Sequence, residues 1–150
     1  MNRIQRVLIL VLGILIALPA EAGIQRIAVL EFTAVGVEDP ALLLSLGDAV
    51  RTGVIKNVDT EHYLVMTRES TLEILKDMGK DLSCLDGLCE VEIARNIGAD
   101  YVISGTIAQI SNSYVLTVKL HETHTAALLL SEQISEKDPL ILVQKMNVMG

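Results

Sequence analysis

The two cysteines of this 150-residue chain, Cys84 and Cys89, are separated by four residues. This spacing differs from the C-x-x-C of thiol oxidoreductases, and a zinc ion would need more ligands than the segment offers. In an oxidising compartment the pair favours a structural disulfide, with two free thiols or a redox or metal site as the alternatives. Because the loop it closes is short, such a bond should add only about 2 kcal/mol of stability.

A second group of side chains that could bind a metal ion or take part in catalysis lies in the segment His121-Glu122-Thr123-His124, which holds two imidazoles and a carboxylate. It is not the H-E-x-x-H signature of a helical zinc site, and in an extended chain positions 121 and 124 point to opposite faces. The pattern therefore predicts a solvated turn and no metal site. The remaining histidine, His62, precedes an expected strand and is interpreted as a surface residue.

Three charged residues are candidates for contact with a partner or ligand: Arg68, Glu69 and Asp100. Arg68 and Glu69 open an expected helix just beyond a strand end, where open α/β sheets place ligand sites. The alternative is structural, with Glu69 favoured by the helix dipole and Arg68 paired with an acid. Asp100, before a strand, is more typical of a turn. The sequence has no G-x-S-x-G, P-loop or G-x-G-x-x-G motif, so we expect no catalytic residue and no cofactor.

The amino terminus has the three-part pattern of a secretory signal peptide. Arg3 and Arg6 precede an apolar run, Val7 to Leu18, and small residues lead up to Ala22. The run is short of the roughly 20 residues needed to cross a bilayer, so cleavage after Ala22 is favoured over a retained anchor. We therefore expect a signal peptide at 1–22, a periplasmic mature domain at 23–150 without a transmembrane span, and an oxidising environment for the cysteines.

The composition of residues 23–150 restricts the partners. This part carries 10 basic and 18 acidic side chains, a net charge of −8. Such a surface repels phosphate backbones, which argues against nucleic acid as a partner. Three Tyr, one Phe and no Trp leave the core to aliphatic side chains and provide no aromatic platform for bases or sugars. The length fits one domain.

Periodicity and capping signals predict one mixed α/β sheet with helices packed on it. Residues 26–32 contain an unbroken apolar run, typical of a central strand covered on both faces. Asp39 and Pro40 begin a helix that extends to about residue 56. Helix connections predict that the first three strands are parallel, and hairpins that the later ones are antiparallel. We expect the strands at 26–32, 63–66, 101–110, 114–121 and 126–134, and the helices at 40–56, 68–78, 86–98 and 139–146.

Two features of these elements indicate that other groups pack closely against them. Gly105 lies inside an expected strand, which is typical of a bulge or of close backbone approach. The last helix is rich in apolar residues up to Met149, so it must pack on the sheet or meet a partner. Whether the natural protein continues past Gly150 is open.

Taken in order, several segments resemble a known family. They are Ile27-Ala28-Val29-Leu30-Glu31-Phe32, Val65-Met66-Thr67-Arg68-Glu69, the cysteine pair with Glu92-Ile93-Ala94-Arg95, and Gly98-Ala99-Asp100-Tyr101-Val102-Ile103-Ser104-Gly105. The chain resembles, over about residues 25–135, the TolB-amino-terminal-like domains of bacterial envelope proteins, a fold group that includes the periplasmic domain of CsgG and the activator LpoB. The resemblance implies a non-catalytic periplasmic module that binds other envelope proteins.

Two departures limit what the resemblance implies. Gly23 stands where CsgG-like and LpoB-like lipoproteins carry the acylated cysteine, and no spare segments exist for the transmembrane strands of a secretion pore. The function expected from the sequence is thus protein interaction in envelope assembly, transport or regulation. The alternatives are a small-ligand sensor near Arg68 and a small hydrolase that uses Asp100 or Glu69 with a histidine.

Overall fold

The computed structural model describes residues 23–77 and 87–149. The expected signal peptide at 1–22, the cysteine Cys84 and the expected cap Asp86 lie outside the described residues, so the boundary at residue 22 stays a prediction. In chain order the elements are β1 (Gln25–Val29), β2 (Thr33–Val35), α2 (Pro40–Asn57), β3 (Tyr63–Val65), α3 (Arg68–Asp77), α4 (Gly87–Asn96), β4 (Tyr101–Ile110), β5 (Ser113–Glu122), β6 (Leu128–Glu136) and α5 (Pro139–Met149).

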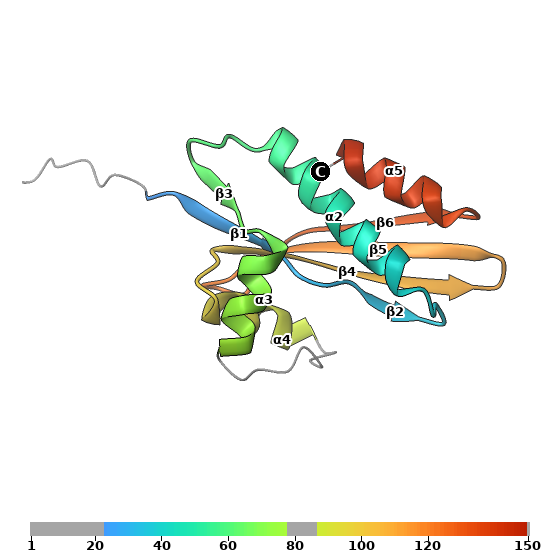
Figure 1. The fold of residues 1–150 in the computed structure, drawn as a ribbon, viewed down its shortest axis with the longest axis horizontal. Coiled ribbons are helices and arrows are strands. Elements are labelled where there is room, and N and C mark those ends of the chain that lie inside the picture. The colour runs from blue at the N-terminus through green and yellow to red at the C-terminus, as the bar shows by residue number, and fades with distance from the viewer. Residues whose placement is uncertain (1–22, 78–86, 150) are drawn as a thin grey trace, which may run out of the picture.

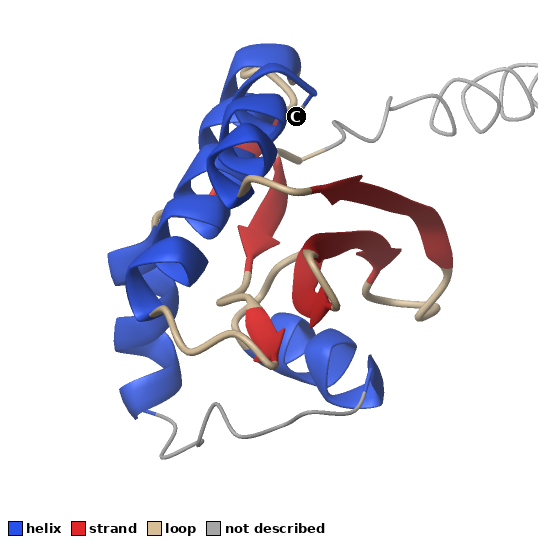
Figure 2. Ribbon diagram, turned by 90° about the vertical axis from the view of Figure 1, so that its right-hand side faces the viewer, coloured by secondary structure: helices blue, strands red, loops and turns tan. Residues whose placement is uncertain are grey.

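The strands form one mixed sheet in the order β3-β1-β4-β5-β6. β1 lies parallel to both β3 and β4, with Ile27 opposite Val65 on one side and Tyr101 on the other. β5 pairs antiparallel with β4 and with β6. The predicted mixed sheet, with parallel strands first and antiparallel hairpins after, is confirmed. Its strands curve strongly (Figure 2).

The short strand β2 was not expected from the sequence. The predicted strand 26–32 ends at Val29, and the chain then rejoins β4 farther along, with Thr33 opposite Thr106. Between Val29 and Thr33 the chain advances four residues while β4 advances three, from Ile103 to Thr106, so one residue is accommodated as an irregularity. The Thr33 and Thr106 hydroxyls then lie 2.9 Å apart.

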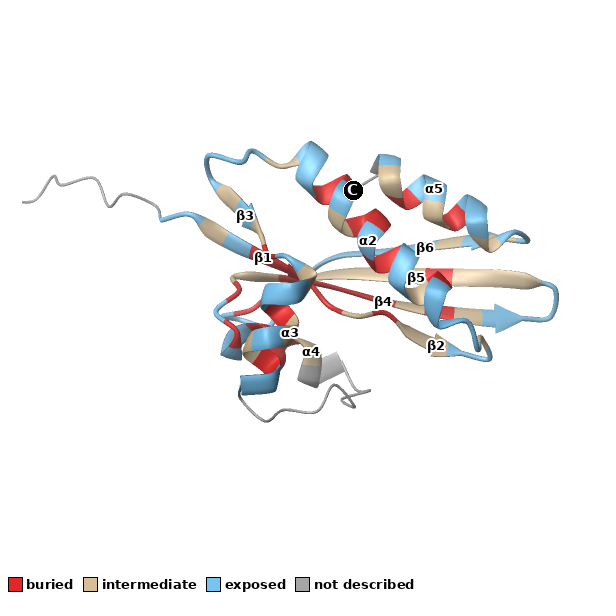
Figure 3. Ribbon diagram, viewed as in Figure 1, coloured by how far each residue is buried: buried red, intermediate tan, exposed pale blue. Residues whose placement is uncertain are grey.

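Helices cover both faces of the sheet: α2 and α5 lie on one side, and α3 and α4 on the other (Figure 1). Along β1, Ile27 and Val29 join the core beneath α2 and α5, whereas Ala28 and Leu30 join the core beneath α3 and α4. This confirms the two-sided burial predicted from the unbroken apolar run. Figure 3 shows the buried residues concentrated between these layers, with β6 largely exposed.

The helix starts agree with the capping signals. Asp39 accepts hydrogen bonds from the backbone nitrogens of Ala41 (3.0 Å) and Leu42 (3.2 Å), and Pro40 begins the helix. The Thr67 hydroxyl accepts from Ser70 N at 3.1 Å at the start of α3. These contacts satisfy amides that have no partner within the helix. Within the described ranges, no helix is long and apolar enough to cross a membrane.

The last strand lies two residues later than predicted, at 128–136 instead of 126–134. Ala126 cannot belong to it because its φ of 61° places it in a left-handed turn. The turn is held by the Glu122 carboxylate, which accepts hydrogen bonds from His124 N (2.7 Å), Thr125 N (2.8 Å) and the Thr125 hydroxyl. The predicted turn around His121 to Thr125 is therefore present, displaced towards residues 123–127.

These hydrogen bonds predict a pH dependence of folding stability. The Thr125 hydroxyl and the amides of Thr125 and His124 lower the pKa of Glu122 from 4.5 to about 2. Because the folded pKa lies below the unfolded one, the stabilisation is complete above about pH 4.5 and is lost as the pH falls towards 2. Thermal melts should show Glu122→Gln less stable than wild type at pH 7, with the difference narrowing below pH 4.5. The matched control Glu73→Gln, on α3, should show no such convergence.

Candidate functional site

Arg68 lies at the carboxyl end of the parallel strands, as predicted, and it is paired. Its Nε donates to Glu31 Oε1 at 2.7 Å, between side chains that are both about one third exposed. The hydrogen bond and the charge of Glu31 raise the pKa of Arg68. The structural alternative, an arginine that meets a nearby acid, is thus present. The sequence did not identify Glu31, which lies 37 positions away.

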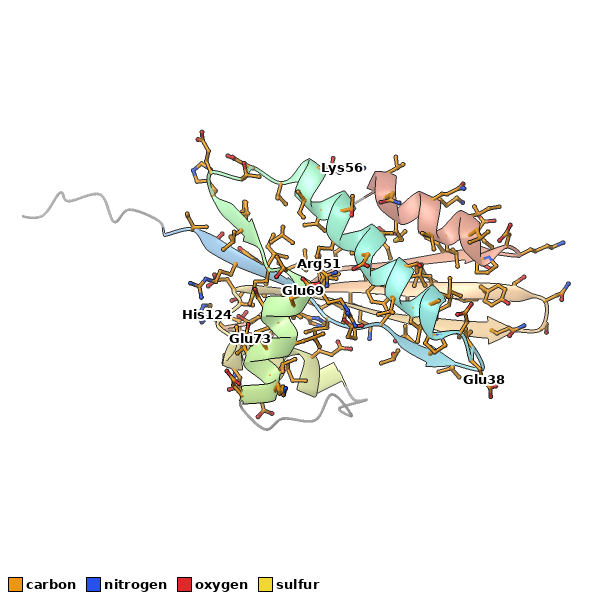
Figure 4. The ribbon with its side chains drawn as sticks, in the orientation of Figure 1. Glu38, Arg51, Lys56, Glu69, Glu73 and His124 are labelled. Carbon is orange, nitrogen blue, oxygen red and sulfur yellow. The ribbon has the colours of Figure 1, made fainter. Side chains whose placement is uncertain are left out.

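Arg51, a second arginine at this end of β1, was not singled out by sequence reasoning. From α2 it donates to the Val29 carbonyl oxygen (3.0 Å) and to Asp48 Oδ1 (2.7 Å). Glu69 is exposed in the first turn of α3, where a helix dipole favours a carboxylate. Figure 4 labels Arg51 on α2 and Glu69 on α3. Both arginines therefore support the local structure.

Asp100 lies at the opposite end of β1. Its Oδ2 accepts a hydrogen bond from Arg26 N (2.8 Å), and its own amide donates to the Arg26 carbonyl oxygen (2.9 Å). The carboxylate thus extends the β1–β4 ladder at the turn that leads into β4. Because Arg68 follows the carboxyl end of β3 and Asp100 precedes β4, the structure does not bring the three predicted contact residues together in one site.

The groups required by the hydrolase alternative are dispersed. His124 Nε2 lies 3.4 Å from Asp100 Oδ1 on the surface, whereas the Ser104 hydroxyl donates to Glu90 Oε2 at 2.6 Å. Nδ1 of His121 is buried without a hydrogen-bond partner. Among the described residues no serine or threonine hydroxyl is bonded to an imidazole, and no three His, Cys, Asp or Glu side chains are grouped to hold a metal ion.

The cavities near Arg68 are much smaller than the cavity on the face of the sheet that α2 and α5 cover. Near Arg68 the cavities measure about 10 Å³ and, beside Ser104, about 120 Å³. Ligand pockets usually measure roughly 300–1,000 Å³. The alternative function, a small-ligand sensor that binds near Arg68, therefore has little space there. A far larger cavity, of about 480 Å³, lies on the face covered by α2 and α5.

This larger cavity, the apolar groove, lies between the carboxyl-terminal half of α2, the end of α5 and the curved sheet. Its walls include Val54, Tyr63, Tyr101 and Met146, and it reaches the sheet edge at Leu130. Of the residues that line it, only Glu132 is charged. Leu129 and Leu130 are 53% and 49% exposed, so the groove reaches solvent at β6. The size, apolar lining and exposure of this groove make it the candidate binding surface of the described residues.

A β-bulge shapes the rim of the groove. Leu120 of β5 lies opposite Leu130, but the next residue, His121, lies opposite Leu128, so Leu129 is the extra residue. Without the bulge, neighbouring residues would point to opposite faces of the sheet. Instead Leu129 and Leu130 both line the groove. The run of three leucines in the sequence carried no signal for this irregularity.

No protein-family model and no curated protein matches this chain. Solved structures do match: the LpoB carboxyl-terminal domain from Escherichia coli is 17% identical with a TM-score of 0.60, and the alignment covers 86% of this chain and 93% of that one. Lipoprotein GNA1162 from Neisseria meningitidis is 13% identical, with a TM-score of 0.58 and coverages of 75% and 80%.

A third match is PelC from Paraburkholderia phytofirmans, a dodecamer, which is 12% identical with a TM-score of 0.53 over 84% of this chain and 86% of PelC. At these identities the comparisons establish a common fold. The chain has an LpoB-like fold, and the resemblance predicted from the sequence is confirmed at that level.

Proposed function

We propose that this protein is a non-catalytic, exported protein-interaction domain that acts in assembly, transport or regulation of the bacterial cell envelope. The observation that carries the proposal is the apolar groove, which is open along an exposed sheet edge. The fold shared with LpoB and with a lipoprotein of Neisseria meningitidis supports it. PelC, with the same fold, forms a dodecamer, so this architecture supports protein contacts in at least one neighbour.

Partner capture from the envelope tests the proposal. Tagged protein, expressed in its native bacterium and cross-linked before extraction, should recover a specific envelope protein. Leu130→Asp should reduce that recovery, because a carboxylate in the groove is costly to desolvate. Leu128→Asp is the matched control: Leu128 lies on the same strand and is similarly exposed, but does not line the groove. Circular dichroism should confirm that both variants are folded.

The three residues predicted from sequence remain proposed as secondary contacts. Arg68 and Glu69 are accessible at the start of α3, and Asp100 lies at the far end of β1. Arg68→Glu should reduce recovery less than Leu130→Asp, because a partly exposed charge contributes less to binding than a desolvated apolar contact. Equal recovery by wild type and Leu130→Asp would contradict the assignment of the groove. Hydrolytic turnover lost in Asp100→Ala or Glu69→Ala would favour an enzyme.

The proposal includes export with cleavage after Ala22 and a disulfide between Cys84 and Cys89. One intact-mass measurement on protein from the periplasmic fraction tests both. The chain should begin at Gly23 and be lighter by two hydrogens than its reduced form. A chain that begins at Met1, recovered from the membrane fraction, would contradict cleavage, and alkylation of both thiols without reductant would contradict the disulfide.

A further inference from the structure

We infer that the apolar groove takes an extended segment of the partner protein, which adds to the sheet as a strand beside β6 and places a basic side chain between two apolar ones on the groove face. The inference rests on the proposed function and specifies the chemistry of the partner.

The edge of the sheet at β6 is suited to such an addition. β6 has nine residues and, among the described strands, pairs only with β5. Natural proteins protect exposed edges with short strands, lysines, prolines or bulges. β6, Leu-Leu-Leu-Ser-Glu-Gln-Ile-Ser-Glu, has neither lysine nor proline, and beyond its bulge at Leu129 residues 130–136 pair regularly with β5. The opposite edge, β3, is three residues long and offers much less backbone. Strand addition is a common mode of peptide recognition.

The side chains of β6 then set the pattern that a partner must present. Leu130, Glu132 and Ile134 lie opposite Leu120, Val118 and Leu116 of β5, on the face that lines the groove. The residues that alternate with them, Ser131, Gln133 and Ser135, belong to the other face. A strand added beside β6 would thus find an apolar, an acidic and an apolar neighbour at alternate positions.

Glu132 is the residue that determines the choice of partner. Its carboxylate has no hydrogen-bond or ion-pair partner among the described residues, and its cross-strand neighbour on β5 is the uncharged Val118. The other acid of this strand, Glu136, is paired with Lys145 of α5. Directly opposite residues on adjacent strands interact favourably when their charges are opposite and unfavourably when they are alike. Lysine or arginine is therefore favoured beside Glu132, and an acid is excluded.

The expected recognition sequence is apolar-x-Lys/Arg-x-apolar. Because it is symmetrical about its centre, it applies to a parallel or an antiparallel strand. The net charge of residues 23–150, −8, also favours a basic partner during encounter. An unpaired charge on an edge strand also discourages aggregation between like edges. Protection against aggregation alone would not give the protein a preference between basic and acidic partners that reverses when the charge at position 132 is reversed.

The test uses purified protein and two fluorescent peptides with the cores Val-Thr-Lys-Thr-Val and Val-Thr-Glu-Thr-Val. By fluorescence anisotropy, wild type should bind the lysine peptide roughly three- to tenfold more tightly than the glutamate peptide. Glu132→Lys should reverse the preference, whereas Gln133→Lys, one position away on the other face, should keep it. On binding, hydrogen exchange should slow at amides within 130–136.

The inference is overturned if neither peptide binds, if Glu132→Lys leaves the preference unchanged, or if binding gives no protection to the β6 amides. Capture from the envelope separates this failure from that of the proposed function. If wild type, Glu132→Lys and Leu130→Asp all recover the same partner equally well, the protein has an interaction role but does not bind its partner by strand addition. If wild type recovers no specific partner, the interaction role itself is contradicted.

Discussion

Replacing Gly105 by alanine should destabilise the folded protein by about 1–3 kcal/mol, as expected for overpacking of a core. Gly105 lies in β4, and the Phe32 ring packs directly on its Cα. A Cβ added there would lie about 2.5 Å from Phe32 Cζ, a distance that non-bonded carbons do not adopt. Chemical denaturation should therefore show a lower midpoint for Gly105→Ala than for wild type.

Two further variants identify the cause of this effect. In a Phe32→Leu background, which removes the ring, Gly105→Ala should cost measurably less than in wild type, because residues in contact are energetically coupled. Gly47→Ala is the matched control. Gly47 lies in α2, and a Cβ added to it would meet no atom within 4 Å, so alanine should add about 0.5–1 kcal/mol of helix stability. An equal cost of Gly105→Ala with and without Phe32 would contradict the explanation.

Leu142→Ala should cost about 2–5 kcal/mol, because a fully buried leucine is replaced by a cavity. Leu142 is 0% exposed on α5 and belongs to the core shared with α2 and the sheet. The control, Leu140→Ala, removes the same atoms two residues earlier in the same helix, where the side chain is 64% exposed, and should change stability by less than about 0.5 kcal/mol.

The Leu142 and Leu140 pair also tests the role of α5. The sequence predicted that this helix packs on the sheet or meets a partner, and the structure gives it a buried face at Leu142 and Met146 and an exposed one at Leu140, Ile141 and Val148. Similar denaturation midpoints for the two alanine variants would mean that α5 does not pack as described.

The elements that local chemistry determines could be predicted from the sequence. The caps at Asp39 and Thr67 and the unbroken apolar run of β1 act through neighbours in the chain, and they located α2, α3 and the central strand. Gly105 was predicted to mark either a bulge or a close approach, and the structure shows the close approach. The sequence did not identify Phe32 as the approaching group, because that contact joins residues far apart in the chain.

The candidate site is formed by residues that lie far apart in the chain, so it was predicted poorly from the sequence. The groove exists because the sheet curves and because a bulge at Leu129 redirects one side chain, and neither property leaves a periodic signal. Arg68, Glu69 and Asp100 were selected by their position at strand ends. Which end each one occupies depends on strand direction, and Arg68 and Asp100 proved to lie at opposite ends of β1.

The pairing of β1 with β4 has a consequence for the order in which the chain folds. Ile27 meets Tyr101 only after the residues between them have been synthesised, and Leu142, in the last described helix, completes the same core later still. Contacts of such long sequence separation slow folding, and the apolar faces of β1 and α2 stay uncovered during that time. The unfolded chain of this protein should therefore present a persistent binding surface to holdase chaperones until α5 has joined the core.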